Sequence, residues 1–433
     1  MNNFFTNYKF YSIINNSVGD DIVKHIYTSL DIGSDSIKIV VCELYKNKLN
    51  LLAASSFPSK GIKRGLITDV ELASMSLKQA FQEINDMLGI KIHKTIVSVP
   101  NYLADYAIVT GDIEISNDKI SHGDVMKSLE KAIKSRKENG KELVTILPID
   151  YKIDNKVIIK DPVGMVSKSL GCRAIAVSVP KKNAYSVLGL LEKVGIEVVD
   201  ISLNNIGDLY SFKNNEFDKR AAAIINIGCE TTSVSVYNKG VVLRSSILNQ
   251  GGKNIDNDLS YMYKVDIDTA KKLKHKHVVA SKKHSNDGDN IEVTNKNNEE
   301  IKINQFELSE VAESRLEEIL NLAKNELNSL TRRKIDYIII TGGTSNMAGF
   351  EYVASSVFGK EVNIGNIKMI GVRNNKYSSC VGNIVYFISK LKLKGRNYTM
   401  IDDGEAEMIS SSSEFKNTPD SVLGKVFGYF FSE

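Results

Sequence analysis

Short runs of β-branched and aliphatic residues alternate along this chain with glycine turns. Such runs predict strands at 29–32 and 36–41, with Gly33 and Ser34 as the tight turn between them. The same order recurs at 221–237, where an apolar strand is broken by an Ile-Gly turn and then resumes. A third glycine turn, at 341–344, follows a buried-strand pattern. Two similar hairpins predict a duplicated α/β domain.

Other apolar spacings predict the elements between these turns. In the first half we expect a strand at 48–58, a helix over 69–88 and a buried strand at 95–99. Further elements are predicted as strands at 107–115, 145–151, 155–159, 174–179 and 197–203, with helices at 123–136 and 181–194. The strand at 174–179 is expected to return to the core sheet.

The second half is predicted to contain a smaller lobe at 249–332. Within it, the polar stretch 277–300 is typical of an exposed loop or hairpin, and 306–330 of a long helix. A buried strand at 335–341 and a last helix at 378–391 complete the core. Residues 396–419 are acidic and then serine-rich, which indicates a flexible linker.

The glycine turns have the chemistry of a phosphate site. Glycine lets backbone N–H groups approach phosphate oxygens, Lys38 can neutralise phosphate charge, and Asp31 can hold a metal ion or its water shell. Gly342 and Gly343 would let the backbone lie close to an adenosine. The three turns together predict nucleotide binding, where one alone would be an ordinary hairpin.

These motifs resemble those of the actin/Hsp70/sugar-kinase ATPases, and most closely those of the FtsA family of bacterial cell-division actin homologues. Further stretches carry the resemblance: FPSKGIKRGLITDVE (57–71), IKDPVGM (159–165), GIEVVDI (195–201) and SRLEEIL (314–320). The resemblance implies a duplicated actin-like (ribonuclease H-like) ATPase fold, with two lobes around a nucleotide cleft and an FtsA-type inserted subdomain.

By resemblance, the chain divides into subdomains in a set order. The expected divisions are an extension at 1–27, subdomain IA at 28–106, 172–205 and 378–395, inserted subdomain IC at 107–171, subdomain IIA at 206–248 and 333–377, subdomain IIB at 249–332, a linker at 396–418 and an amphipathic membrane-targeting helix at 419–433.

The same resemblance implies ATP and Mg²⁺ as cofactors, with Asp31 meeting magnesium through water. The residues expected to bind nucleotide are Asp31, Gly33, Ser34, Lys38, Asn226, Gly228, Thr231, Thr232, Gly252, Lys274, Gly342, Gly343 and Thr344. Three positions depart from the family pattern D-I-G-G-G-T-T: Asn226 replaces a carboxylate, and Cys229 and Glu230 replace glycines. An amide is a poor metal ligand and no base, and Glu230 adds an anion near phosphates. We therefore expect an ATP-binding scaffold with at most weak ATPase activity.

The resemblance also implies partners. The lobe at 249–332 is expected to bind the C-terminal peptide of the tubulin homologue FtsZ, with Arg315 as an exposed residue that meets an acidic peptide. The protein is expected to assemble with itself into a filament and to recruit other division proteins through the inserted subdomain. The balance of 56 basic against 52 acidic residues does not indicate a nucleic-acid partner.

The end of the chain predicts a lipid contact. Six apolar residues gather on one face of the helical pattern at 421–431: Val422, Leu423, Val426, Phe427, Phe430 and Phe431. About three turns of helix cannot span a bilayer but can lie in its headgroup region. We expect a peripheral protein on the cytoplasmic face of the cell membrane at the division site.

Two alternative functions, and one alternative site, remain open from the sequence. A pilus-assembly actin homologue would have a similar insert but no lipid-binding tail. A phosphotransferase of the sugar-kinase type needs a carboxylate where Asn226 stands. The basic run 271–277 could hold a metal or a polyanion, although a solvated helix end explains it better.

Overall fold

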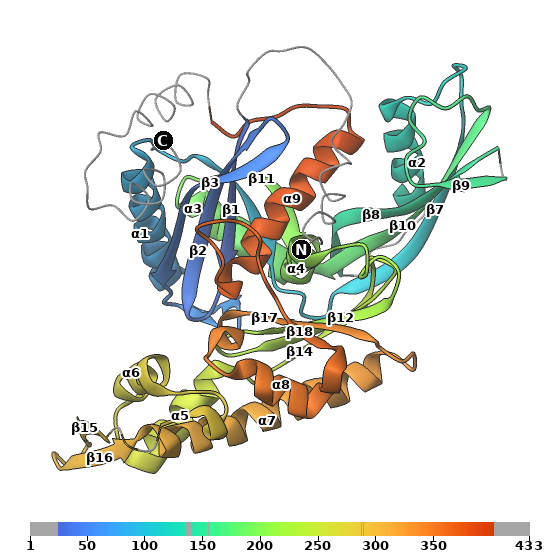
Figure 1. The fold of residues 1–433 in the computed structure, drawn as a ribbon. Coiled ribbons are helices and arrows are strands. Elements are labelled where there is room, and N and C mark those ends of the chain that lie inside the picture. Colours follow the sequence, from blue (N-terminus) through green and yellow to red (C-terminus); the bar gives the residue numbers. More distant parts are fainter. Residues whose placement is uncertain (1–24, 135–139, 155, 287, 289, 402–433) are drawn as a thin grey trace, which may run out of the picture.

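The computed structural model describes residues 25–134, 140–154, 156–286, 288 and 290–401. The predicted C-terminal helix, most of the linker before it and most of the N-terminal extension lie outside the described residues. Within them the chain forms two sheet-centred lobes, with a third sheet projecting from one side (Figure 1).

Two five-stranded sheets share one topology. The first has the order β11-β6-β1-β2-β3 and the second the order β14-β13-β12-β17-β18. In each, a central strand (β1 or β12) pairs antiparallel with the next strand in sequence and parallel with a later one (β6 or β17). The strands are β1 His25–Ile32, β2 Ser36–Tyr45, β3 Lys48–Pro58, β6 Lys94–Val99, β11 Glu197–Leu203, β12 Ala221–Ile227, β13 Thr232–Asn238, β14 Val241–Leu248, β17 Tyr337–Thr341 and β18 Val362–Ile364. The predicted duplicated α/β fold is confirmed.

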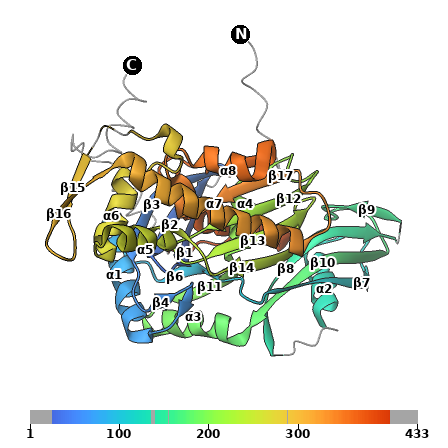
Figure 2. The same cartoon turned by 90° about the horizontal axis from the view of Figure 1, so that it is seen from below.

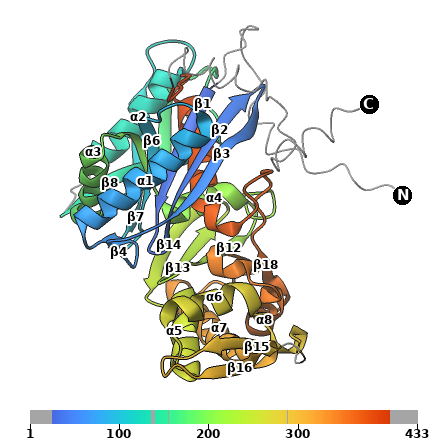
Figure 3. The same ribbon diagram turned by 90° about the vertical axis from the view of Figure 1, so that its left-hand side faces the viewer.

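Helices cover both faces of the first sheet. Helices α1 and α3 lie on one face and α4 and α9 on the other (Figures 1 and 3). Their bounds are α1 Val70–Leu88, α3 Lys181–Lys193, α4 Asn204–Phe212 and α9 Ser378–Leu393. Helix α1 begins where predicted because the Asp69 carboxylate accepts the Leu72 N–H at 3.0 Å, and it ends at Gly89, whose φ is 71°.

The inserted sheet has the order β7-β10-β8-β9, and α2 packs on it (Figure 1). Its elements are β7 Asp105–Glu114, α2 His122–Lys134, β8 Lys141–Ile153, β9 Val157–Ile159 and β10 Ser169–Pro180. The expectation that 174–179 returns to the core sheet is wrong. Strand β10 pairs along its length with β7 and β8, so the core position beside β6 is taken by β11.

The second lobe carries a helical layer and a small hairpin, seen from below in Figure 2. The predicted long helix is confirmed as α7, and the exposed stretch before it contains the β15–β16 hairpin. The remaining elements are α5 Gly252–Tyr263, α6 Ile267–His277, β15 Asn290–Thr294, β16 Glu300–Asn304, α7 Gln305–Leu330, α8 Phe350–Phe358, the short pair β4 Ile62–Lys63 and β5 Leu66–Ile67, and single 3₁₀ turns at 282–284, 343–346, 359–361 and 375–377.

Each of these bodies has its own apolar cluster. The first sheet and its helices share the largest cluster, the second lobe has another, and the inserted sheet packs a small one against α2. Among the described helices, none is both long enough and apolar enough to cross a bilayer.

Candidate functional site

A cleft of about 750 Å³ lies between the two lobes, where the turns of both hairpins face each other. Of the thirteen residues expected to bind nucleotide, twelve line this cleft: Asp31, Gly33, Ser34, Lys38, Asn226, Gly228, Thr231, Gly252, Lys274, Gly342, Gly343 and Thr344. Thr232 does not, because its side chain is fully buried and its hydroxyl donates to the Gln250 carbonyl at 2.8 Å.

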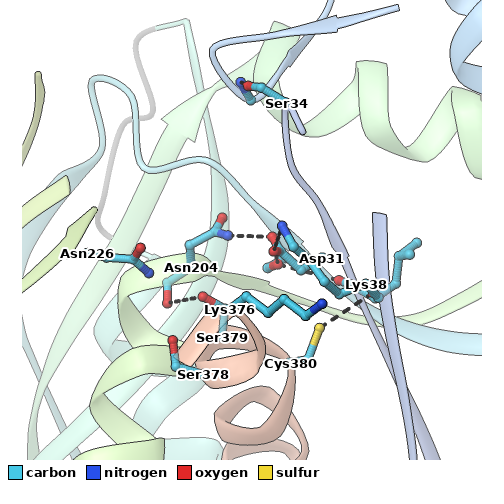
Figure 4. Close-up of polar contacts among 12 residues, drawn as sticks. Asp31, Ser34, Lys38, Asn204, Asn226, Lys376, Ser378, Ser379 and Cys380 are labelled. Atoms are coloured by element: carbon cyan, nitrogen blue, oxygen red, sulfur yellow. Dashed lines mark hydrogen bonds and ion pairs between the residues drawn. The ribbon is translucent and has the colours of Figure 1, made fainter. Parts of the chain in front are cut away.

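The first hairpin presents a carboxylate and a lysine as cross-strand neighbours. Asp31 on β1 lies opposite Lys38 on β2, and the Lys38 ammonium is 3.2 Å from the Asp31 carboxylate. Burial would lower the pKa of Lys38, but the charge of Asp31 holds that pKa above its usual value. Figure 4 shows Asn204 pointing from α4 toward Asp31, to which it donates at 2.7 Å. The Lys38 ammonium and the Asn204 amide therefore both donate to the Asp31 carboxylate next to the first turn.

The second hairpin repeats this geometry with different chemistry. Asn226 lies opposite Ser233, as Asp31 lies opposite Lys38, so this strand pair has neither the carboxylate nor the ammonium. Its turn is closed by the Gly228 N–H donating to the Thr231 carbonyl at 2.9 Å. The strand pair behind the second turn therefore offers neither a strong metal ligand nor a base, whereas the turn itself can offer backbone donors.

The third turn requires its first glycine. Gly342 has a φ of 93°, and a Cβ there would lie 2.4 Å from the Ile227 carbonyl oxygen. Gly343 has no such constraint, since its Cβ would meet only Lys376 at 3.8 Å. Thr344 bonds to the Gly228 carbonyl at 3.0 Å, which joins the third turn to the second hairpin. Gly342 and Thr344 therefore pack against the second hairpin, and the space for a ligand beside the backbone lies at Gly343.

A buried carboxylate behind the second turn was missed by sequence reasoning. Asp208 on α4 is 1% exposed and accepts hydrogen bonds from Asn226 at 2.7 Å, Ser378 at 2.6 Å and Ser379 at 3.0 Å. Burial raises the pKa of Asp208 to about 6 against the lowering effect of these hydrogen bonds. Helix α4 was not predicted, so no sequence signal pointed to this group.

Lysines from three elements surround the cleft. Lys274 on α6 is buried, donates to the Gly252 carbonyl at 3.0 Å and pairs with Asp256 at 2.7 Å. Lys376, which sequence reasoning also missed, lines the cleft beside the start of α9. Burial lowers the pKa of Lys376, and the nearby charge of Lys38 lowers it further. Lys38 and Lys376 both line this glycine-lined cleft, close enough for the charge of Lys38 to lower the pKa of Lys376, and such a pair of cations favours an anionic ligand beside it.

No metal-binding group of three or more His, Cys, Asp or Glu side chains occurs within the described residues. The basic run 271–277 therefore has no local ligand set for a metal. Lys271 instead reaches across the cleft and pairs with Asp35 of the first hairpin.

Arg315 lies far from the cleft, in a shallow groove of about 350 Å³ between α5 and α7. Its guanidinium forms a two-pronged ion pair with Asp258, at 2.5 and 2.8 Å, and a further pair with Glu318. The sequence-based expectation of an exposed arginine is therefore wrong: only 24% of its side chain is exposed. The six apolar residues at 422–431 lie outside the described residues.

The duplicated sheets and the cleft between them define the class: this is a protein with the actin-like ATPase fold. Solved structures share that fold, namely a PilM-PilN type IV pilus biogenesis complex (TM-score 0.55, 14% identity, 84% of this chain and 99% of that chain) and MreB5 of Spiroplasma citri bound to ADP (TM-score 0.51, 15% identity, 86% and 98%). Within this class, two family models match. "Cell division protein FtsA" matches residues 223–382, and "SHS2 domain inserted in FTSA" matches residues 106–178.

Curated relatives agree with the family models. The cell division protein FtsA of Bacillus subtilis (strain 168) is 27% identical over 394 residues, covering 90% of each chain. That of Streptococcus pneumoniae serotype 2 is 27% identical over 361 residues, covering 82% of this chain and 78% of the relative. The chain belongs to the FtsA family of cell-division proteins.

Proposed function

We propose that this protein acts in cell division as an ATP-binding scaffold that assembles into an actin-like polymer and tethers the FtsZ ring to the cytoplasmic membrane. One observation carries the nucleotide part of the proposal: Lys38 and Lys376 face a common glycine-lined cleft, and the pKa of Lys376 is lowered by burial and by the charge of Lys38. A phosphate chain between them would relieve that repulsion. The MreB5 structure with ADP, which has the same fold, adds support.

The residues of the cleft fit an adenine nucleotide. Gly343 leaves space beside its backbone, since an added Cβ there would meet nothing nearer than Lys376 at 3.8 Å, and the two hairpin turns supply backbone donors. Both Asp31 oxygens already accept protein hydrogen bonds, which favours an indirect contact to Mg²⁺ through water over direct coordination. Magnesium would neutralise phosphate charge when bound.

The same site does not favour hydrolysis. Asn226 cannot remove a proton from water, and Asp208, the nearest carboxylate behind it, is 1% exposed. Binding without rapid turnover suits a scaffold, and it argues against the sugar-kinase alternative. The pilus-assembly alternative is supported only by the fold that this chain shares with the PilM-PilN structure. Both family models instead name FtsA.

Calorimetry with ATP and Mg²⁺ tests the site. The double variant Lys38→Ala, Gly343→Asp should lose binding, because it removes a cation and adds an anion at a sterically open position. The matched control Lys48→Ala, Gly189→Asp makes the same changes away from the cleft, where Gly189 has no neighbour within 4 Å of an added Cβ. Equal ATP affinity in the two double variants would exclude the proposed nucleotide site.

A further inference from the structure

The Glu230 carboxylate lies between the two lobes, surrounded by hydrogen-bond donors. Its Oε2 accepts the backbone N–H of Arg64 at 2.7 Å, and its Oε1 accepts from the Lys253 ammonium at 2.6 Å. It also shares a hydrogen bond with the Ser34 side chain. Only 12% of the Glu230 side chain is exposed. The side chain thus links the turn of the second hairpin to the first lobe.

This set of donors is the kind that binds a phosphate group. A backbone N–H, an ammonium and a hydroxyl converge on one anionic group in a partly buried site. Ser34 belongs to the first phosphate turn and itself accepts the N–H of Gly65 at 2.8 Å. The protein therefore supplies its own anion where the two phosphate turns meet.

The position of Glu230 in the cleft places it near the phosphate end of a bound nucleotide, opposite the adenosine end. Gly342 and Thr344 abut the second hairpin at Ile227 and Gly228, at the edge where an adenosine would lie. Glu230 stands at the tip of the same hairpin, against the tip of the first. A phosphate chain that runs from the adenosine edge toward both tips approaches Glu230 with its last phosphate.

We propose that the Glu230 carboxylate occupies the place of a terminal phosphate, so that the cleft binds a nucleoside diphosphate in preference to a triphosphate. This inference rests on the proposed function, because it requires the cleft to bind adenine nucleotides. A triphosphate must displace the carboxylate from Arg64, Ser34 and Lys253, or lie against it with like charge. A diphosphate leaves these contacts in place.

The contact also holds the lobes together before any nucleotide binds. Asp35 of the first hairpin and Lys271 of α6 form a second ion pair across the cleft. Both links join the first lobe to the second through side chains rather than through a ligand. Loss of the Glu230 link should therefore expose the Arg64 amide in the protein without nucleotide.

The test compares the affinities of ADP and the β,γ-imido analogue of ATP by calorimetry. Glu230→Gln keeps the size of the side chain and removes its charge, so the triphosphate affinity relative to ADP should rise by about tenfold. Glu230→Gly should show the same change and should also speed hydrogen exchange at the Arg64 amide. The matched control Glu216→Gln removes a carboxylate paired with Arg220 at 2.7 Å, away from the cleft, and should leave the ratio unchanged.

Three results would overturn the proposal. If the affinity ratio is the same in wild type, Glu230→Gln and Glu230→Gly while both nucleotides bind, Glu230 does not discriminate between them. If the Arg64 amide exchanges equally fast in wild type and Glu230→Gly, the carboxylate does not link the lobes. If neither nucleotide binds to any variant, the proposed function fails and this inference fails with it.

Discussion

Asn226 on β12 donates its side-chain amide to the carboxylate of Asp208 on α4 across 2.7 Å. Asn226 holds the register position that Asp31 holds in the first hairpin, so the carboxylate of the second half stands behind the strand instead of on it. Asp208 is shielded there by Ser378 and Ser379 at the start of α9. The second half therefore has a carboxylate near its turn, but this carboxylate belongs to Asp208 and is buried behind β12.

Restoring a carboxylate at Asn226 should destabilise the protein. Asn226→Asp would place two carboxyl groups at hydrogen-bond distance in a buried site, where like charges cost roughly 1–3 kcal/mol of unfolding free energy at pH 7.5. The exchange variant Asn226→Asp, Asp208→Asn should recover most of this loss, because an amide again faces a carboxylate. Urea unfolding measures both. A double variant no more stable than the single one would contradict the pairing.

The raised pKa of Asp208 predicts a pH dependence of stability. Its folded value of about 6 exceeds the ordinary 3.8, so the folded protein binds more protons than the unfolded chain between these values. The contribution of Asp208 to stability is therefore greatest below the lower value and is lost as pH rises through about 6. Wild type should lose stability relative to Asp208→Asn by about 1–3 kcal/mol between pH 4 and pH 7. The difference is measured by urea unfolding at both pH values, and an unchanged difference would show that Asp208 titrates normally.

Helices α4 and α9 cross with their backbones in contact. A Cβ on Gly382 would lie 1.7 Å from the carbonyl oxygen of Gly207, so Gly382→Ala must push the helices apart. We expect a loss of about 2–3 kcal/mol of unfolding free energy, measured in urea. Gly189→Ala on α3 is the control: its Cβ meets nothing within 4 Å, and alanine there should stabilise the helix by about 0.5–1 kcal/mol. Equal effects at both sites would mean that the crossing tolerates a methyl group.

We propose that the second lobe binds the FtsZ C-terminal peptide, and the pairing of Arg315 then predicts a small role for the charge of this arginine in that binding. Because Asp258 and Glu318 already neutralise the guanidinium, Arg315→Gln should lower the affinity for an acidic peptide by no more than about threefold. Asp258→Asn should instead strengthen binding by a similar factor, because it releases the guanidinium. Fluorescence anisotropy with a labelled FtsZ C-terminal peptide distinguishes the two. Complete loss of binding in a folded Arg315→Gln protein would show that the arginine contacts the peptide directly.

The C-terminal segment is predicted to bind lipid through its aromatic residues. Phe427→Glu with Phe430→Glu should release the full chain from liposomes and leave ATP binding intact. The apolar residues should supply most of the lipid affinity, because Lys425 is the one lysine in 421–431. Lys425→Gln should have a smaller effect. Co-sedimentation measures all three proteins. Retention of the double variant at the wild-type level would exclude this segment as the membrane anchor.

The elements that the sequence predicted correctly are those fixed by local interactions. The two hairpins follow from a few apolar residues on each side of a glycine turn, and their register places Lys38 opposite Asp31. The start of α1 follows from the Asp69 cap, and the long α7 from its apolar spacing. Because such signals depend on neighbours in the chain, the duplicated fold and most of the cleft lining could be predicted.

The tertiary structure decided what depends on contacts between distant segments. Asp208 meets Ser378 and Ser379 because Gly207 and Gly382 let α4 and α9 touch, and it meets Asn226 because α4 also packs beside β12. Lys376 enters the cleft from the turn before α9. Asp258, one of the two ion-pair partners of Arg315, lies on another helix, and β10 joins the inserted sheet by pairing with β7 and β8. The residue types at these positions determine which contacts are chemically possible. Only the packing of the folded chain determines which of those contacts form, because burial and distance set their energies.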